Sequence, residues 1–562
     1  MPDTHHEAQR AYAPPLSETA AEEHIHGICF KTGPPGRVGV ELEWLVRAHG
    51  DAAAPAGHER VTRALAELTE AGELPGGGRL TIEPGGQVEI SSAPATGIGS
   101  CVTQAGRDLA AVREALGEAG LTLAGLGVDP YRLPARVLDL PRYAAMEQFF
   151  DRHGPWGRVM MCSTASVQVC VDAGGDDDGY SGFRWRWRLL HALGPVLVAA
   201  FANSPLRAGR LTGWKSTRQA VWAQLDPSRT LAPAGAEPWP RGPSAAGRGT
   251  PHDAARAASW TANNGRMTGP AGVTRTSGTI GRNGDGRPVP GSGGDTGLLA
   301  GLSRWGAAGP GWPPNPRGPG GTGSAGAGHV YVSRAGAEPD GAAFHVSARD
   351  GAADPRAAWA QYALDAEVMC VQRGEGQGWS APPGLTFRDW LRGRGCEERP
   401  PTLADLSYHL STLFPPVRPQ GHLELRVIDA QPGDGWIVPA AVVSALADDP
   451  VAAQQAMAAA GSVWRDGPGP VRSGAGQRGA GQHGPAAPNG SGGPPGPWLR
   501  AARAGLADPE LARAARDCFE AADAALGRAG AAPDIRQRVT DFAEEYVLRG
   551  RCPADDTLED LR

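Results

Sequence analysis

Acidic side chains recur at alternate positions of short apolar segments, a spacing that could support metal chemistry. They are Glu41, Glu43, Glu83, Glu89 and Glu424. Because side chains alternate between the two faces of a β-strand, the two glutamates of the segment 38–46 would share one face, about 7 Å apart. Valine, leucine and tryptophan would occupy the opposite face. Acids crowded in this way repel one another unless cations lie among them.

Three further segments repeat this alternation. In 80–90, one glutamate precedes a Pro-Gly-Gly turn or bulge and another follows it. In 166–171, Gln168 alternates with valines, and in 422–427 a glutamate and Arg426 alternate with leucine and valine. Any one segment is typical of a half-buried strand with a solvated polar face. Taken together, the polar positions of the four segments contain five glutamates and an arginine but few Lys, Thr or Ser residues of the kind found on an ordinary solvated surface. This composition favours a functional face.

Oxygen ligands without clustered cysteine or histidine suit a hard cation such as Mg²⁺, which binds through a few carboxylates plus substrate phosphates. The acidic face therefore indicates nucleotide chemistry. The usual nucleotide motif is absent, because Trp214 separates Gly213 from Lys215 and breaks a Walker A pattern in 209–216. No H-E-x-x-H, G-x-S-x-G or EF-hand motif occurs either.

Several longer strings follow one another in a fixed order along the chain. They are Gly39-Val-Glu-Leu-Glu43, Glu83-Pro-Gly-Gly-Gln-Val-Glu89, Met160-Met161, 164–172, 201–205, Arg218 with Trp222, 409–418 and Leu423-Glu-Leu-Arg426. Together they resemble the glutamate–cysteine ligases of the plant and bacterial type. Within this family the chain is most similar to the actinobacterial branch that serves ergothioneine biosynthesis, through 362–370 and 426–432. The resemblance covers roughly 25–232, 351–465 and 498–562.

The resemblance implies an α+β fold like that of glutamine synthetase and the guanido kinases, in which a curved antiparallel sheet forms a funnel with helices outside. It also implies a reaction with ATP as substrate and Mg²⁺ as cofactor. ATP would activate the γ-carboxylate of glutamate as γ-glutamyl phosphate. The amine of cysteine would then displace phosphate and give γ-glutamylcysteine.

Residue roles follow from the same resemblance. The Mg²⁺ ions would be held by Glu41, Glu43, Glu83, Glu89 and Glu424, with Gln168 as a further ligand or hydrogen-bond donor. Arg426 would act as the catalytic residue that stabilises the transferring phosphoryl group, a task that suits a bidentate guanidinium. Phosphoryl transfer depends on positioning and charge neutralisation more than on covalent chemistry.

Further basic and apolar residues are candidates for substrate contacts. Arg218 and Lys215 could bind the phosphates of ATP, and Arg418 could bind a substrate carboxylate or phosphate. For the two arginines, ordinary salt bridges are the alternative in so arginine-rich a chain. Met161 and Thr164 could contact the acceptor substrate, and for Met161 the alternative is packing.

Two other functions stay open at this point. A related ligase could couple glutamate to a different amine. Alternatively, a non-catalytic scaffold could use the acidic face to bind cations and a basic insert to bind a partner. The complete set of acids together with Arg426 argues against the scaffold, because a retired site has no reason to keep them together.

Composition divides the chain into ordered segments and Gly/Pro-rich segments. The positions 241–330 contain 24 Gly and 10 Pro, too little apolar surface for burial to offset chain entropy. The predicted division is a disordered tail (1–24), a first catalytic segment (25–232), a disordered insert (233–350), a second catalytic segment (351–465), a disordered linker (466–497) and C-terminal helices of the catalytic domain (498–562). The insert is locally basic, so an anion-binding arm is an alternative for it.

Charge and cysteine usage narrow the partners and the compartment. A net charge of −6 argues against nucleic acid as the main partner. Scattered cysteines without a C-x-x-C pair, and the absence of a signal or membrane-spanning segment, favour the cytoplasm. We therefore expect small-molecule substrates and no association with a membrane.

Helices are predicted over 106–118, after Asp508 and around 535–546.

Overall fold

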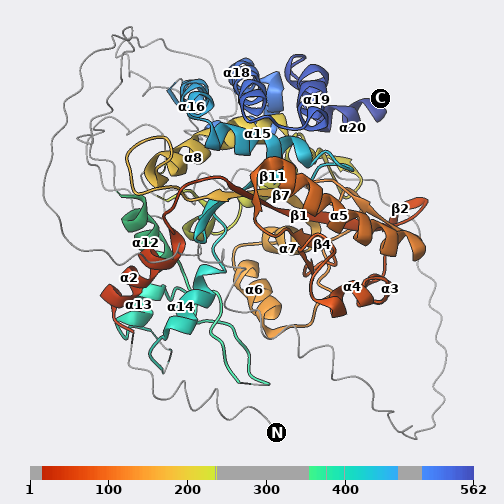
Figure 1. Ribbon diagram of the computed structural model, residues 1–562. Helices are drawn as coiled ribbons and strands as arrows, with labels where there is room; N and C mark the ends of the chain where they lie inside the picture. Colours follow the sequence, from red (N-terminus) through yellow and green to blue (C-terminus); the bar gives the residue numbers. More distant parts are fainter. Residues whose placement is uncertain are drawn as a thin grey trace, which may run out of the picture.

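The computed structural model describes residues 16–233, 236, 354–374, 376–395, 397, 399–465 and 496–561. In this part of the chain, antiparallel strands and helices form an α+β fold (Figure 1). The central sheet runs in the order β10-β11-β7-β1-β4-β3, and β2, β5 and β6 also pair with the long strand β1. The strands are β1 (Arg37–Ala48), β2 (Asp51–Pro55), β3 (Arg79–Ile82), β4 (Val88–Ser91), β5 (Ala95–Thr96), β6 (Leu121–Ala124), β7 (Ser166–Asp172), β10 (Val417–Pro419) and β11 (His422–Asp429).

The four segments that alternate acidic and apolar residues are confirmed as strands, with 80–90 forming the hairpin β3–β4. Their apolar positions, such as Leu42, Val169 and Leu425, all belong to one buried core. Helices cover that side of the sheet, above it in Figure 1. They include α8 (Phe183–Ala200), α15 (Ile437–Asp448), α16 (Pro450–Arg465), α18 (Pro509–Arg528) and α19 (Pro533–Phe542). The acidic positions consequently lie on the other side of the sheet.

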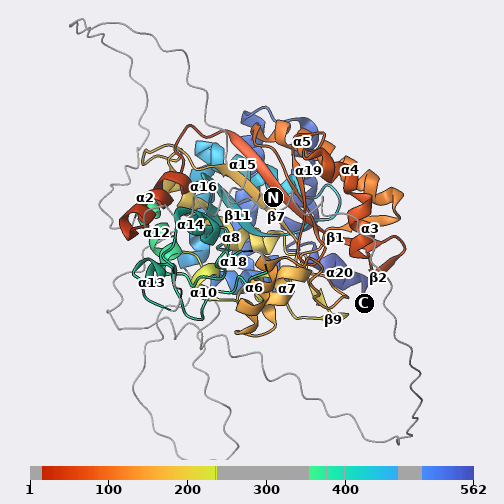
Figure 2. The same ribbon diagram turned by 90° about the horizontal axis from the view of Figure 1, so that it is seen from below.

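Smaller helices surround the strands when the molecule is viewed from below (Figure 2). They are α2 (Glu18–Cys29), α3 (His58–Ala64), α4 (Ala66–Ala71), α6 (Pro141–Asp151), α7 (Trp156–Ser163), α10 (Pro227–Thr230), α12 (Pro355–Asp365), α13 (Phe387–Leu391) and α14 (Leu403–Leu410). A second buried apolar cluster lies among α6, α7 and α14 and includes Phe149, Met161 and Tyr408. Helices α6, α7 and α14 therefore share an apolar cluster that is separate from the main core.

The predicted helices are also found, with longer bounds. The segment 106–118 belongs to α5 (Gly97–Glu118). Helix α18 begins after Asp508, whose carboxylate accepts hydrogen bonds from the backbone N–H groups of Glu510 and Leu511. Helix α19 continues into a π-helical turn, η4 (Ala543–Val547), and a short helix α20 (Ala554–Asp560) follows.

The predicted tail 1–24 is wrong at its end, because residues 18–24 are part of α2. Ser17 caps this helix, and Ala21 and Ile25 are buried in the main core. The insert predicted over 233–350 and the linker predicted over 466–497 fall almost wholly outside the described residues. The main core takes side chains from all three catalytic segments, among them Val40, Leu364 and Leu511. In the described part of the chain, no helix is long and apolar enough to cross a membrane.

Candidate active site on the acidic face of the sheet

The central strand β1 brings two glutamates to the middle of the acidic face. Glu43 lies opposite Glu89 of β4, and Glu41 lies opposite Gln168 of β7. Directly opposite residues in an antiparallel pair have their Cβ atoms about 5 Å apart. The Nε2 group of Gln168 donates a 2.9 Å hydrogen bond to Glu43 Oε1. Strand register therefore places these four side chains side by side, as the sequence predicts.

Glu83 reaches the same face through the turn between β3 and β4. Gly86 has φ +86°, a left-handed conformation that favours glycine. A Cβ atom on Gly85 would lie 2.2 Å from the backbone oxygen of Cys162, so only glycine fits there. Gln87 fixes the turn, because its Nε2 donates to the backbone oxygens of Met161 and Thr164. The Pro-Gly-Gly-Gln string is thus explained by backbone geometry, and Gln87 is structural.

Strand β11 adds a buried carboxylate that is surrounded by cationic groups. Glu424 is fully buried, and Arg418 donates two hydrogen bonds to it, of 2.8 and 3.0 Å. Gln420 Nε2 donates a third, of 2.9 Å, and Arg426 Nη1 also donates to this carboxylate. Arg418 therefore forms a buried, bidentate ion pair with a predicted metal ligand. This is the salt-bridge alternative that the sequence left open for Arg418.

Arg426 joins the two halves of the acidic face. Its Nη1 donates both to Glu424 and to the Oε1 atom of Gln168, whose amide group in turn donates to Glu43. The Nε atom of Arg426 is buried and has no hydrogen-bond partner among the described residues. The predicted catalytic arginine thus lies among the predicted metal ligands with part of its donor capacity unused.

Burial raises the pKa of most of these carboxyl groups. Burial, followed by repulsion from Glu89, raises the pKa of Glu43 to about 7 and that of Glu83 to about 8. Burial together with the Glu424 and Glu89 charges raises the pKa of Glu41 well above its usual range. Glu424 behaves differently. Burial also opposes its charge, but Arg418 and Arg426 outweigh this and lower its pKa to about 2.

The acidic face fits divalent cations. In the described part of the chain, no three acidic, histidine or cysteine side chains already converge as a ready metal cage. Mg²⁺ does not require one, because it usually takes one or two carboxylates and completes its shell with water and substrate phosphates. Burial is the largest cause of the raised pKa values of Glu41, Glu43, Glu83 and Glu89, so a cation bound among these carboxylates would stabilise their charged forms.

Arg218 lies beneath Arg426. Its side chain is 2% exposed, stacks 4.6 Å from the ring of Trp222, and donates a 2.8 Å hydrogen bond from Nη2 to the backbone oxygen of Arg426. Its Nη1 lies 4.0 Å from Asp429, and its Nε and Nη1 have no hydrogen-bond partner in the described structure. This buried guanidinium has donors to spare for an anion, in keeping with the predicted phosphate contact.

Three predicted substrate residues make contacts within the protein. Lys215 forms an ion pair with Asp555 near the C-terminus, and within the described residues no hydrogen bond or ion pair joins its side chain to the acidic face. The Thr164 hydroxyl donates a 2.6 Å hydrogen bond to the backbone oxygen of Met160. Met161 is buried in the apolar cluster of α6, α7 and α14. The structure therefore does not bring Lys215 to the other predicted residues.

A basic residue whose charge acts on Glu83 was not predicted from the sequence. Arg142, in α6, lowers the pKa of Glu83, against the effect of burial. Its guanidinium lies 5.2 Å from the ring of Tyr408 and donates to the hydroxyl and backbone oxygens of Ser411, each at 3.3 Å. Its neighbour Tyr143 has a pKa raised by burial and by the Glu83 charge. An arginine in a short Pro-Arg-Tyr string carries no spacing signal, so only the fold identifies it.

Comparison with known proteins identifies the family. The family model described as Glutamate-cysteine ligase family 2 (GCS2) matches residues 37–238 and 343–466, which include every residue of the acidic face. The chain belongs to this family. The matched ranges also contain Arg142, Arg218 and Asp429.

Individual relatives give the same result over nearly the whole chain. Glutamate–cysteine ligase EgtA of Mycobacterium tuberculosis is 33% identical over 542 residues, covering 96% of this chain and 89% of the relative. Glutamate–cysteine ligase EgtA of Mycolicibacterium smegmatis is 32% identical and covers 97% of this chain and 92% of the relative. The chloroplastic glutamate–cysteine ligase of Arabidopsis thaliana is 32% identical over 153 residues, 27% of this chain and 28% of the relative.

Proposed function

We propose that this family member is an ATP-dependent glutamate–cysteine ligase. It would join the γ-carboxylate of glutamate to the amine of cysteine through γ-glutamyl phosphate, and supply γ-glutamylcysteine for ergothioneine biosynthesis. The observation that carries the proposal is the acidic face, where glutamates on β1, β4, β11 and the β3–β4 turn meet Arg426 on buried strands. The likeness to relatives named glutamate–cysteine ligase selects the two amino acids.

The charges of the acidic face suit the transfer of a phosphoryl group from ATP. Glu41, Glu43, Glu83, Glu89 and Glu424, with Gln168, would hold Mg²⁺. Bound Mg²⁺ would neutralise phosphate charge and bring the triphosphate to these carboxylates. Arg426 and Arg218 would donate hydrogen bonds to the transferring group, because both guanidinium groups have N–H donors without partners among the described residues.

Arg142 would orient glutamate. Its charge acts on Glu83, and its side chain is held by Tyr408 and Ser411, so its position is fixed before substrate arrives. A fixed guanidinium suits a substrate carboxylate. Since proximity and orientation supply much of the rate of a two-substrate reaction, this residue would contribute through positioning.

The acceptor would bind near the apolar cluster of α6, α7 and α14. Met161, Met369 and Cys370 lie in this cluster, and soft, polarizable side chains suit a thiol. Cysteine differs from serine by one atom, and a change of one small group alters transition-state binding by about 1–3 kcal/mol. The expected preference for cysteine over serine or alanine is therefore roughly tenfold to a few hundredfold in kcat/KM.

The test is phosphate release from ATP with glutamate and a panel of amines. Release should be glutamate-dependent and fastest with cysteine, and Met161→Ala should narrow the gap between cysteine and serine. Equal rates of phosphate release with cysteine, serine and alanine would indicate that the protein is a ligase for another amine. No glutamate-dependent release with any amine would favour the cation-binding scaffold instead.

The same proposal extends to the architecture. A funnel like that of glutamine synthetase would follow if the sheet curves around the acidic face, and one catalytic domain would be built from 25–232, 351–465 and 498–562. The single core that joins these segments supports this division. The proposed location is the cytoplasm. In a fractionated lysate, we therefore expect the ligase activity in the supernatant and none in the membrane fraction.

A further inference from the structure

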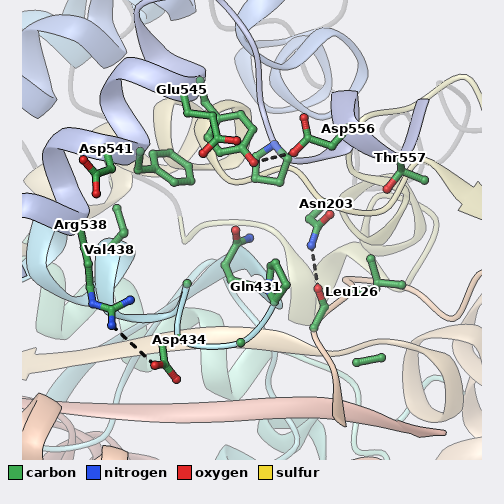
Figure 3. Close-up of a pocket in the computed structure, with 18 of the residues that line it drawn as sticks. Leu126, Asn203, Gln431, Asp434, Val438, Arg538, Asp541, Glu545, Asp556 and Thr557 are labelled. Atoms are coloured by element: carbon green, nitrogen blue, oxygen red, sulfur yellow. Dashed lines mark hydrogen bonds and ion pairs between the residues drawn. The ribbon is translucent and has the colours of Figure 1, made fainter. Parts of the chain in front are cut away.

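A cavity of about 580 Å³ lies between the sheet and the C-terminal helices, and it shares no lining residue with the acidic face. Figure 3 shows its walls. The segment after β6 and the turn after β11 form the floor, and α19, η4 and α20 form the roof. Nothing in the proposed ligase reaction uses it.

Two buried carboxamides form the floor of the cavity. Asn203 is 3% exposed, and its Nδ2 donates to the backbone oxygens of Gly125 and Ala430 at 2.7 and 3.0 Å. Gln431 is 2% exposed, and its Nε2 donates to the backbone oxygens of Phe201 and Asp429, both at 2.9 Å. Both N–H donors of each amide are thus spent on carbonyl groups, which fixes the amide orientation.

The two carboxamide oxygens are left without donors. No described residue donates a hydrogen bond to Asn203 Oδ1 or Gln431 Oε1, although both residues line the cavity. In Figure 3 both oxygens lie on the cavity side of their residues. Neither oxygen is sealed from the cavity, so the hydrogen-bond donors of a ligand could reach both of them.

Carboxylates in both the floor and the roof add negative charge, which Arg538, another lining residue, offsets in part. Asp434 is paired with Arg113 at 2.8 Å and with Arg538 at 3.7 Å. By contrast, Asp541 and Glu545 form no ion pair within the described residues, although both line the cavity. The roof and floor therefore present acceptors of both kinds, neutral and anionic.

Between these polar groups the walls are apolar. The cavity is lined by Leu126 and Val438 (Figure 3). Its lining also includes Phe542 and Tyr546. The floor is also preorganised, because the backbone N–H of Asn203 donates a 2.9 Å hydrogen bond to the buried carboxylate of Asp429. A fixed floor of acceptors limits the ordering cost of binding.

We propose that this cavity binds a small organic cation with several N–H donors and an apolar body, such as an alkyl diamine or an alkylguanidine. Its cationic head would donate to the carboxamide oxygens of Asn203 and Gln431, and its charge would be balanced by Asp541 and Glu545. The apolar body would contact Val438 and Phe542. This site is separate from the acidic face of the sheet and does not depend on the ligase reaction.

The test is isothermal titration of the full-length protein with agmatine, an alkylguanidine with a terminal amine. Agmatine should bind at one site per chain, and neutral hexanediol of similar length should not bind. The double variant Asp541→Asn/Glu545→Gln should weaken binding about fivefold, as expected for about 1 kcal/mol from two partly exposed charges. Thr557→Trp, which fills the cavity from α20, should abolish binding without any change of charge.

Two controls make the proposal refutable. Glu544→Gln removes an exposed charge from the same turn, η4, but outside the cavity, and should leave agmatine affinity unchanged. Glu43→Gln alters the acidic face and should also leave it unchanged. Loss of binding in Glu43→Gln, an equal loss in Glu544→Gln, or equal binding of hexanediol would each overturn the proposal. Agmatine binding that survives Thr557→Trp would overturn it as well.

Discussion

The acidic face of the sheet and the C-terminal cavity both present several carboxylates, but water reaches them differently. On the sheet, Glu424 is fully buried and Glu43 is held on a central strand between two neighbours. At the cavity, Asp541 and Glu545 are exposed side chains on the last helical turns. Acidic composition is therefore a poor guide by itself. Carboxylates buried on rigid strands are stabilised strongly by a nearby cation, whereas exposed carboxylates are stabilised only weakly.

The largest expected effect is on folding stability. Glu424→Gln leaves Arg418 and Arg426 buried without their shared carboxylate, and breaking a buried ion pair costs about 3–5 kcal/mol. Glu545→Gln at the cavity should change stability by less than about 0.5 kcal/mol, as for other exposed sites. Chemical denaturation of both variants measures the difference. Similar midpoints for the two would contradict the distinction between buried and exposed acids.

The next effect is on turnover. Glu43→Gln keeps the side-chain volume but removes a charge from the centre of the acidic face, so Mg²⁺-dependent phosphate release should fall about 10²–10³-fold. The fold should persist, because burial already opposes ionisation of this carboxyl group. Glu545→Gln serves as the matched control and should retain normal turnover. Near-normal turnover of Glu43→Gln would refute its assignment as a metal ligand.

A further effect is expected from pH in the absence of metal. Because the pKa of Glu43 is raised from 4.5 to about 7 and that of Glu83 to about 8, the folded state keeps protons that the unfolded state has already lost. The free energy of unfolding should therefore fall as pH rises from about 5 to 8. The contribution of Glu43 to this fall is on the order of 3 kcal/mol.

Thermal melts without and with Mg²⁺ measure this dependence. Glu43→Gln should flatten the decline with pH, and Glu545→Gln should leave it unchanged. Added Mg²⁺ should raise Tm most at pH 8, where the carboxylates are ionised and free to bind it. A melting temperature that rises with pH in the metal-free protein would contradict the raised pKa values.

The smallest effect is expected from the segment between the two halves of the sheet. All residues of the acidic face lie outside 240–335, and α10 packs against α12 on either side of the gap. Replacing 240–335 with a short Gly/Ser linker should change stability by less than about 1 kcal/mol, because loop-closure entropy varies slowly with length. Phosphate release should be retained. Loss of soluble protein would show that this segment contributes to the fold.

Much of the acidic face was predictable from the sequence. Alternation along a strand assigns Glu41 and Glu43 to one face, and the buried valines and leucines opposite confirm that assignment. The turn after Glu83 was also predictable, since proline fixes its own φ and glycine accepts the positive φ that a tight turn requires. The tail was mispredicted over 18–24, because its alanines and histidines show little hydrophobic contrast and become helical by packing on the core.

What the sequence by itself determined is local: strand alternation, turn chemistry, helix caps and the set of carboxylates. These depend on backbone sterics and on neighbours within a few positions. Only the tertiary structure decided which charges meet. It pairs Arg418 with Glu424 and Lys215 with Asp555. It also lets the charge of Arg142 act on Glu83, and it places Asn203 and Gln431 in the lining of one cavity. Such pairings join residues far apart in the chain, and burial then sets their strength, so no spacing rule reveals them.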